Sequence, residues 1–163
     1  MKKLLGLLML FAFAAVMAHA VESVSDDGTA KAKIIQAATL THQDGALDFG
    51  TLIADDDGGT STLEAVASPA AQDSGIKRVT AHPVSSDHFK LENLDGDTTY
   101  TVSVPASVTI TNGTQTMSVA LTKSNATVSG ATSKDLYVGG TLTVGANQAV
   151  GEYEGTYQMT VTY

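Results

Sequence analysis

The 163-residue chain contains no cysteine and no tryptophan, and it has only three prolines. Without cysteine the protein cannot form disulfides, use a thiol as a nucleophile, bind zinc through thiolates or carry a lipid on a cysteine. Basic residues are also scarce, because nine Lys and Arg stand against 17 Asp and Glu, a formal net charge of −8 at pH 7. Such an acidic surface repels phosphate backbones and anionic membranes, which disfavours nucleic acid and phospholipid as partners.

Helical periodicity is absent as well. No stretch repeats apolar residues at steps of three and four over three turns. Short alternating runs rich in Thr, Val and Ser are separated instead by clusters of Gly, Asp and Asn. This pattern predicts an all-β protein, which we expect to be a two-layer antiparallel immunoglobulin-like sandwich of about nine strands.

The first residues have the three parts of a secretory signal peptide. Lys2 and Lys3 precede an apolar stretch from Leu4 to Met17, which is followed by Ala18-His19-Ala20. About 14 apolar residues are too few to cross a bilayer core, which takes roughly 20. We therefore expect residues 1–20 to be a signal peptide cleaved after Ala20, with export to the periplasm, the cell surface or the medium. Residues 21–28 are then a flexible N-terminal segment, and residues 29–163 form a single β-sandwich domain.

The clearest alternation lies in the last residues, Gly151 to Tyr163. The odd positions carry the apolar side chains of Tyr153, Tyr157, Met159, Val161 and Tyr163, with Gly155 between them. The even positions carry Glu, Thr and Gln. An extended strand with this period of two has one apolar and one polar face. We expect the apolar face to pack in the core, and the strand to leave an edge that no later segment covers.

A second alternating segment, Thr29 to Leu40, lies near the start of the expected domain. Its apolar side carries Ala30, Ala32, Ile34, Ala38 and Leu40, and its polar side carries Lys31, Lys33 and Thr39. Gln36 interrupts the apolar side and Ile35 the polar side. The segment is therefore predicted to be a strand with a bulge or a change of pairing midway.

Shorter runs predict the remaining strands. They span residues 46–53, 60–67, 76–81, 89–92, 100–104, 108–111, 117–121 and 136–144. Asn112-Gly113 joins two of these runs and is a strong hairpin signal. Gly139-Gly140 lies inside a run without the lysine and helix of a phosphate loop, so the pair indicates a bulge or a close backbone approach.

Motifs for catalysis are missing. The histidines after residue 20 are His42, His82 and His88, and none has the spacing beside a glutamate that zinc proteases use. No G-x-S-x-G sequence is present to form a serine nucleophile elbow. We therefore expect no enzymatic activity and no cofactor.

Two acidic turns have carboxylates at alternate positions, Asp55 with Asp57 and Asp95 with Asp97. Calcium accepts oxygen ligands in such an arrangement. The first turn lacks the distant glutamate of an EF-hand loop, however, and the second has Thr98 where that loop has glycine. Solvated turns explain both sequences better, and calcium binding remains the alternative.

Three sequence elements, taken in order, resemble a known family. They are Leu47-Asp48-Phe49-Gly50, the stretch from Val138 to Val144, and the stretch from Gly151 to Tyr157 that leads to the final Tyr163. Together they resemble the bacterial domain-of-unknown-function family numbered 4402, found on secreted proteins, over residues 29 to 163. The resemblance implies a β fold and export, and no catalytic residue.

The chain is also similar, more loosely, to spore coat protein U domains and chaperone–usher pilins. Those proteins share the signal peptide, an early x-F-G strand and a closing G-x-Y-x-x-T strand, but this chain has no cysteine pair. In such pilins the N-terminal segment of a neighbouring subunit completes the sandwich. The resemblance implies partners of three kinds: other copies of the chain, other subunits of a surface assembly, and a periplasmic chaperone.

Two functions follow from these observations. The first is an exported, pilin-like structural subunit of a bacterial surface fibre or matrix that assembles by β-strand addition, without catalysis and without insertion into a membrane. Its candidate assembly residues are Ala30, Ala32, Ile34, Tyr157, Met159, Val161 and Tyr163. The alternative is a self-contained secreted or periplasmic binding domain of unknown ligand, in which Thr29 to Leu40 pairs within its own sheet.

Overall fold

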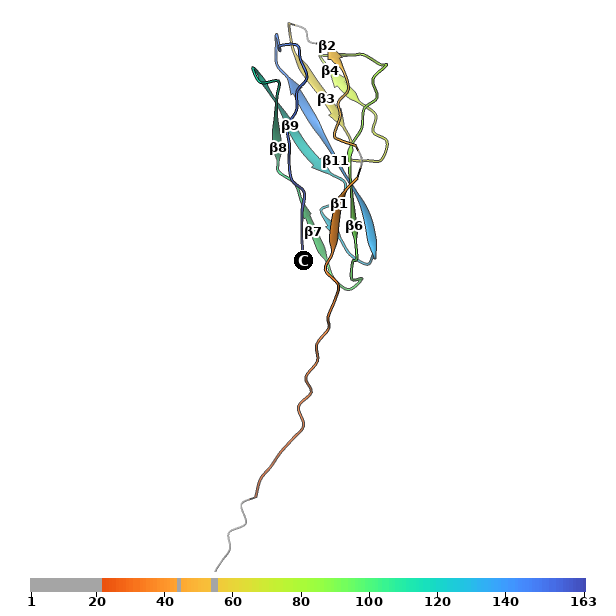
Figure 1. The fold of residues 1–163 in the computed structure, drawn as a ribbon, viewed down its shortest axis with the longest axis vertical. Helices are drawn as coiled ribbons and strands as arrows, with labels where there is room; N and C mark the ends of the chain where they lie inside the picture. Colours follow the sequence, from red (N-terminus) through yellow and green to blue (C-terminus); the bar gives the residue numbers. More distant parts are fainter. Residues whose placement is uncertain (1–21, 44, 54–55) are drawn as a thin grey trace, which may run out of the picture. The chain divides into compact units, whose positions relative to one another are not determined.

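A computed structural model describes residues 22–43, 45–53 and 56–163 (Figure 1). All regular elements within these residues are β-strands, and every pairing between them is antiparallel. The prediction of an all-β chain is confirmed. Over the same residues there is no helix long and apolar enough to cross a membrane. The predicted signal peptide, Val21 and Asp55 lie outside the described residues.

The chain divides into two units, Met1–Lys33 and Ile34–Tyr163. The described residues of the first unit, 22–33, are exposed and contain no strand. The second unit contains all of the strands.

The largest sheet has seven strands. They are β1 (Thr39–His42), β3 (Gly59–Leu63), β4 (Gln72–Ser74), β6 (Asp87–Glu92), β8 (Ser107–Thr111), β9 (Thr116–Lys123) and β11 (Ser133–Val144). β11 is central, because it pairs with β6 through its first half and with β9 and β3 through its second half. β1 pairs with β6, β4 with β3, and β8 with β9.

Two smaller sheets complete the fold. One is formed by β10 (Thr127–Val128), β7 (Tyr100–Ser103) and β12 (Thr160–Thr162), and the other by β2 (Leu52–Ile53) and β5 (Lys77–Arg78). The described residues thus form twelve strands, more than the sequence pattern indicated. The additional strands are short polar pieces such as β4 and β10, which carry no alternating apolar run.

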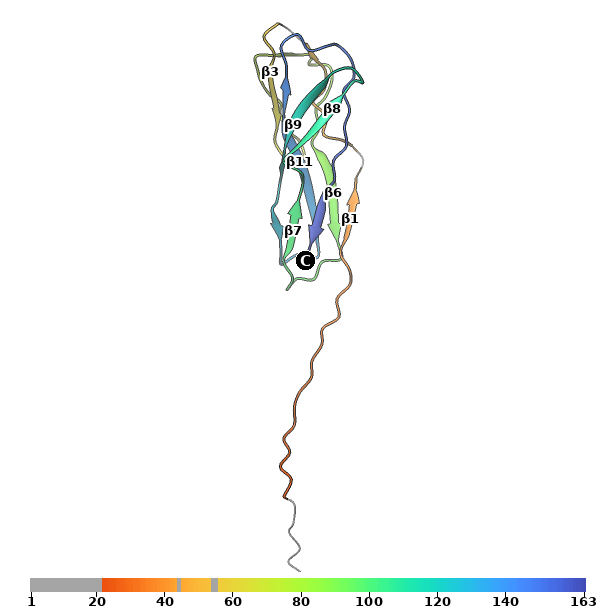
Figure 2. The same ribbon diagram turned by 90° about the vertical axis from the view of Figure 1, so that its left-hand side faces the viewer.

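The core consists of two hydrophobic clusters that follow one another along β11. The first cluster is built from Leu91, Leu94, Tyr100, Val102, Val128, Leu136, Val138 and Met159. The second cluster is built from Phe49, Leu63, Ile76, Val119, Leu142 and Val144. Alternate β11 residues, from Leu136 to Val144, contribute to both, since every second side chain of a strand points to the same face. Ala38 and Leu40, at the beginning of β1, pack against the first cluster. Figures 1 and 2 both show the C-terminal residue, Tyr163, near β7, at the end of the second unit where β1 begins.

The predicted strand from Thr29 to Leu40 is largely wrong. Only Thr39–His42 is a strand, paired with β6 from Thr39 opposite Glu92 to His42 opposite Phe89. Residues 29–38 have no strand assignment. The physical reason is that alternation defines two faces but does not supply the partner backbone that a strand requires.

The predicted strand from Gly151 to Tyr163 has the expected faces but is only partly paired. Met159 is 6% exposed, and Tyr153, Tyr157 and Val161 are half-buried. All even positions from Glu152 to Thr162 are exposed. Among the described residues, backbone pairing of this segment is nevertheless limited to β12, which lies beside β7, and to one bridge between Glu154 and Thr111 of β8.

Two local predictions are confirmed. β8 and β9 form the expected hairpin, with Ile110 opposite Met117 and Gly113 at a φ of 88° in the turn. Gly139 allows a close approach, because a Cβ atom there would lie 2.3 Å from the carbonyl oxygen of Leu63.

Candidate functional site

An apolar groove of about 910 Å³ lies over one face of β8, β9 and β11. Its floor is formed by the side chains of Val108, Ile110, Met117, Val119, Leu142 and Val144. Residues 46–52, termed the first wall, and residues 148–157, termed the terminal wall, also line it. Val119, Leu142 and Val144 are buried in this floor, whereas Val108, Ile110 and Met117, which pack against the second cluster, are half-buried and partly accessible between two extended segments of chain.

A second hollow, of about 500 Å³, continues the groove toward the first cluster. Both hollows are lined by Ala46 and Leu47 of the first wall and by Gly155, Thr156 and Tyr157 of the terminal wall. The second hollow adds Leu40, His42, Asp87, Phe89, Gln158 and Met159. The groove thus runs from the second cluster to the first, and polar side chains line both parts of it, among them Gln148 and Glu152 in the larger hollow and His42 and Asp87 in the smaller one.

The terminal wall is paired on one side only. Glu154 exchanges both backbone hydrogen bonds with Thr111 of β8, at 2.9 and 3.1 Å. Because successive residues of an extended chain direct their backbone groups to opposite sides, Tyr153 and Gly155 direct theirs away from β8 and toward the groove. In the described part of the chain, no backbone hydrogen bond reaches Gly155–Gln158. This stretch has the properties of an open strand edge.

The first wall is also paired on its outer side. Asp48 exchanges both backbone hydrogen bonds with Ser85, at 2.9 and 3.0 Å, which directs the backbone of Leu47 the other way. Gly50 then bends the chain, with a φ of 65° and its N–H donated to Asp48 Oδ1 at 2.7 Å. The groove therefore lies between two backbone edges that are each paired on their far side.

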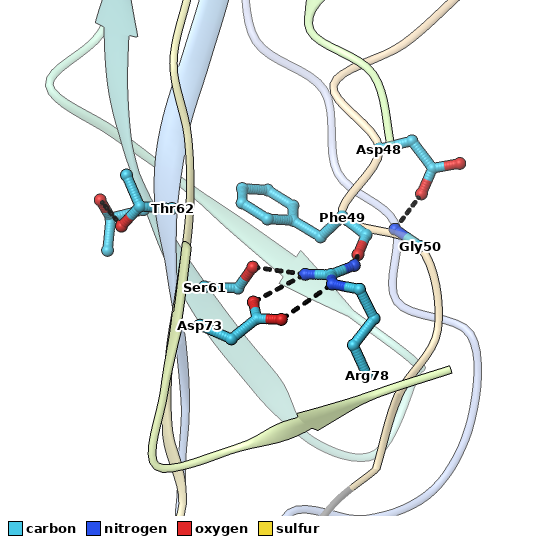
Figure 3. A network of polar contacts seen from close by, with 8 residues as sticks. Asp48, Phe49, Gly50, Ser61, Thr62, Asp73 and Arg78 are labelled. Atoms are coloured by element: carbon cyan, nitrogen blue, oxygen red, sulfur yellow. Dashed lines mark hydrogen bonds and ion pairs between the residues drawn. The ribbon is translucent and has the colours of Figure 1, made fainter. Parts of the chain in front are cut away.

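A polar network holds the first wall in position (Figure 3). Arg78 of β5 donates one hydrogen bond to the carbonyl oxygen of Phe49 and another to Ser61 Oγ at 2.7 Å. Its guanidinium also donates to both carboxylate oxygens of Asp73, at 2.8 and 2.9 Å. Hydrogen bonds from Arg78 lower the pKa of Asp73 from its ordinary value. One guanidinium thus ties the first wall to β3 and β4.

A Tyr–Asp–His cluster closes the first-cluster end of the groove. Tyr157 Oη donates to Asp87 Oδ2 at 2.5 Å, and His42 Nε2 lies 2.6 Å from Asp87 Oδ1. The Asp87 residue is only 6% exposed. Burial of the phenol and the neighbouring Asp87 carboxylate raise the pKa of Tyr157. The cluster links the terminal wall to β6 and β1, and both carboxylate oxygens are occupied.

Sequence reasoning did not identify this cluster. Alternation could have pointed to it. Asp87 is two residues from Phe89 in β6, and His42 is two residues from Leu40 in β1. Each polar side chain therefore lies on the core-facing side of its strand. A polar residue at such a position needs a partner. That partner, Tyr157, is 70 residues away from Asp87 in the chain.

The other histidines lie elsewhere. His82 Nδ1 contacts Thr51 Oγ1, and His88 Nε2 lies 2.9 Å from Asp135 Oδ1. The His88 ring is stacked on Tyr137, with centroids 4.8 Å apart. No two of the three histidines are hydrogen-bonded to the same side chain.

Within the described residues, no three His, Asp or Glu side chains are grouped so that they could hold a metal ion. Asp95 Oδ2 accepts a hydrogen bond from Thr98 Oγ1 at 2.9 Å inside its turn. Of the carboxylates considered as calcium ligands, Asp57, Asp95 and Asp97 lie among the described residues, and Asp55 lies outside them.

The candidate assembly residues fall into two groups. Ala30, Ala32 and Ile34 are exposed, and Ile34 retains 95% of its accessible surface. Tyr157 and Met159 line the groove, and Val161 packs against the first cluster. The Tyr163 ring lies 5.0 Å from that of Tyr100 but is 59% exposed.

These features define an antiparallel all-β domain with an apolar groove between two backbone edges. The chain belongs to the family described as Domain of unknown function (DUF4402), whose model matches residues 35–163. The predicted family resemblance is confirmed, whereas the similarity to spore coat protein U and pilin domains stays a prediction. Comparison with curated proteins and with solved structures found no match.

Proposed function

We propose that the protein is an exported structural subunit of a bacterial surface fibre or matrix, with no enzymatic activity. Its domain is an incomplete two-layer, immunoglobulin-like sandwich, and subunits join by β-strand addition. The groove is the observation that carries the proposal. An extended segment between the walls would supply hydrogen-bond partners to both edges and cover the half-buried side chains of Val108, Ile110 and Met117.

The segment that fits this groove is Thr29–Ile34 of a second copy. Ala30, Ala32 and Ile34 share one apolar face, and the 95% exposure of Ile34 leaves a large aliphatic side chain available for burial. The opposite face carries Lys31 and Lys33. Glu152 and Glu154 are exposed on the terminal wall, so charges of opposite sign would meet along the rim.

Substitution of Ile34 by Asp tests the proposal. A charged side chain cannot enter an apolar groove without a large desolvation cost, so we expect Ile34→Asp to keep the protein monomeric. Val24 is equally exposed, at 95%, but lies before the inserted segment, so Val24→Asp is the matched control and should assemble like the unsubstituted protein. Sedimentation and electron microscopy of the mature protein measure assembly. Monomers of the unsubstituted protein at every concentration would rule out the structural-subunit proposal.

The second candidate is a self-contained secreted or periplasmic binding domain. The Tyr–Asp–His cluster of His42, Asp87 and Tyr157, which lines the smaller hollow, favours it, because ligand sites combine apolar surface with a few polar groups. A monomeric protein whose groove is open to an added ligand would support this candidate in place of the first.

A further inference from the structure

We infer that assembled copies pack side by side through a second surface, the uncharged outer face of the sheet formed by β4, β3, β11, β9 and β8. The inference rests on the proposed fibre and adds the contact between neighbouring fibres. This outer face is the reverse side of the strands β8, β9 and β11 that carry the groove floor, so a segment in the groove leaves it free.

Two rows of side chains cross this outer face, because residues directly opposite in paired strands share a face. The first row is Ser74, Thr60, Thr143, Ser118 and Thr109. The second row, two residues along each strand, is Gln72, Thr62, Thr141, Ala120 and Ser107. All of these residues are exposed or half-buried, and all but Gln72 and Ala120 carry a hydroxyl group. We term the two rows the hydroxyl face.

The hydroxyl face carries no charged side chain, although the chain has 17 Asp and Glu. The other half of the same sheet does have charges on its outer side. There Lys90 Nζ lies 3.1 Å from Glu92 Oε1, and His88 Nε2 lies 2.9 Å from Asp135 Oδ1. The sheet is thus divided into a charged half over the first cluster and an uncharged half over the second.

Two carboxylates are close in sequence to the hydroxyl face, but neither lies within its rows. Asp73 of β4 is directed to the opposite side of the sheet, where it accepts hydrogen bonds from Arg78. Glu64 follows β3 and accepts a hydrogen bond from Gln72 Nε2 at 3.4 Å. Glu64 therefore marks the border of the uncharged region.

Charge and chemistry together select a second copy as the occupant. The full chain has a formal net charge of −8, and an uncharged area reduces the repulsion between two copies where they meet. A hydroxyl group both donates and accepts hydrogen bonds, so the hydroxyl face can pair with itself across a two-fold axis. A neutral polysaccharide also offers hydroxyl groups, but ligand sites usually contain aromatic rings, and the two rows contain none.

The contact is small, which explains why it needs a fibre. Twisted sheets can pack face to face with their strands about 30° apart. Neighbouring strands are about 4.8 Å apart, so five strands give a face about 19 Å wide. Such a contact is weak between two single copies, but it is repeated by every subunit along a fibre. The Ile34→Asp protein, which should form no fibres, should therefore stay monomeric although its hydroxyl face is intact.

A charge in the centre of the hydroxyl face tests the inference. Thr143 is exposed on the middle strand of the first row, so Thr143→Asp should keep the fold and the single fibres and abolish bundles of fibres. Thr41 is an exposed threonine of the same sheet, opposite Lys90 in the charged half, so Thr41→Asp adds the same charge and should bundle like the unsubstituted protein. Electron microscopy and low-speed pelleting of the mature proteins measure bundling.

A mixing experiment identifies the partner surface. Fibres of Thr143→Lys should stay single, because like charges meet where the face contacts its own copy. Mixed with fibres of Thr143→Asp they should bundle, because opposite charges then meet at the same place. Bundles of Thr143→Lys fibres alone would mean that the face contacts a different, acidic surface, which overturns the self-contact.

Other outcomes overturn the inference in distinguishable ways. Single fibres of the unsubstituted protein would remove the lateral contact and keep the proposed function, whereas monomers would overturn both. Bundles of Thr143→Asp would exclude the hydroxyl face. Loss of bundling in Thr101→Asp instead would assign the contact to the three-stranded sheet, which has a shorter exposed row of Thr127, Thr101 and Thr162. Single fibres that pellet with added cellulose, except when Thr143 is replaced by Asp, would assign the face to a neutral polysaccharide.

Discussion

Arg78 is the residue on which the first wall depends most. Its side chain is 11% exposed, and Asp73 is its charged hydrogen-bond partner. The same guanidinium reaches Ser61 and Phe49, so one side chain connects three separate segments of the second unit. A buried guanidinium without its carboxylate would carry an uncompensated charge.

Substitution of Asp73 by Asn should lower the free energy of unfolding at pH 7 by about 1 kcal/mol, because the charge-assisted hydrogen bonds from Arg78 are weakened and solvent screens the exposed carboxylate. The pKa of Asp73 is lower in the folded protein than its ordinary value of 3.8. Its contribution is therefore complete above pH 3.8 and is lost as the pH falls toward the lower folded pKa. Urea unfolding of dilute protein at several pH values measures this. A difference between the two proteins that stays constant into the acid range would contradict the assignment.

Among the elements, the terminal wall and β12 combine two roles. Met159 and Val161 anchor this segment to the first cluster, and Tyr157 is held by Asp87. The stretch Gly155–Gln158 between these anchors and the Glu154 bridge keeps its backbone available. Within the described chain, side chains rather than backbone hydrogen bonds hold this stretch, so its backbone edge is open to a partner.

Replacement of Met159 by Ala should therefore cost about 3 kcal/mol of stability, the size expected for truncation of a buried side chain. Gln158 is exposed beside it, so Gln158→Ala should change the free energy of unfolding by less than about 0.5 kcal/mol. Urea titrations of both variants at low protein concentration provide the comparison. Similar losses at the two positions would mean that both faces of the segment are buried.

At the scale of the whole molecule, net charge bears on the proposed assembly. The full chain has a formal net charge of −8, so copies repel one another electrostatically. Lys31 and Lys33 concentrate positive charge in the segment proposed to enter the groove. The segment lies close behind the expected cleavage site, near the N-terminus of the mature chain. We therefore expect strand addition to require that the signal peptide has been removed.

The signal peptide remains a prediction that mass spectrometry can check. Protein recovered from the periplasm or the medium should begin at Val21, because Ala18-His19-Ala20 has the small residues that signal peptidase requires. An Ala20→Arg substitution should retain the leader, and Val21→Ile is the control that leaves the small residues unchanged. A secreted protein that still carries Met1 would exclude cleavage.

The sequence alone determined the faces of the strands, the β8–β9 hairpin and the family. The faces and the hairpin depend on neighbours two to ten residues apart, which alternation or turn chemistry expresses directly, and the family rests on three sequence elements between Leu47 and Tyr163. For the same reason, Met159 on the core side and Gln158 on the solvent side could be predicted without a structure.

Only the tertiary structure decided which edges are paired and where the groove lies. His42 and Asp87 are 45 residues apart, and Asp87 and Tyr157 are 70 apart. Such contacts depend on the order of strands in the sheets, which a local pattern does not encode. The same limit explains why the predicted strand at Thr29–Ala38 is wrong. Its alternation defines two faces, but a strand forms only where another backbone supplies its hydrogen bonds.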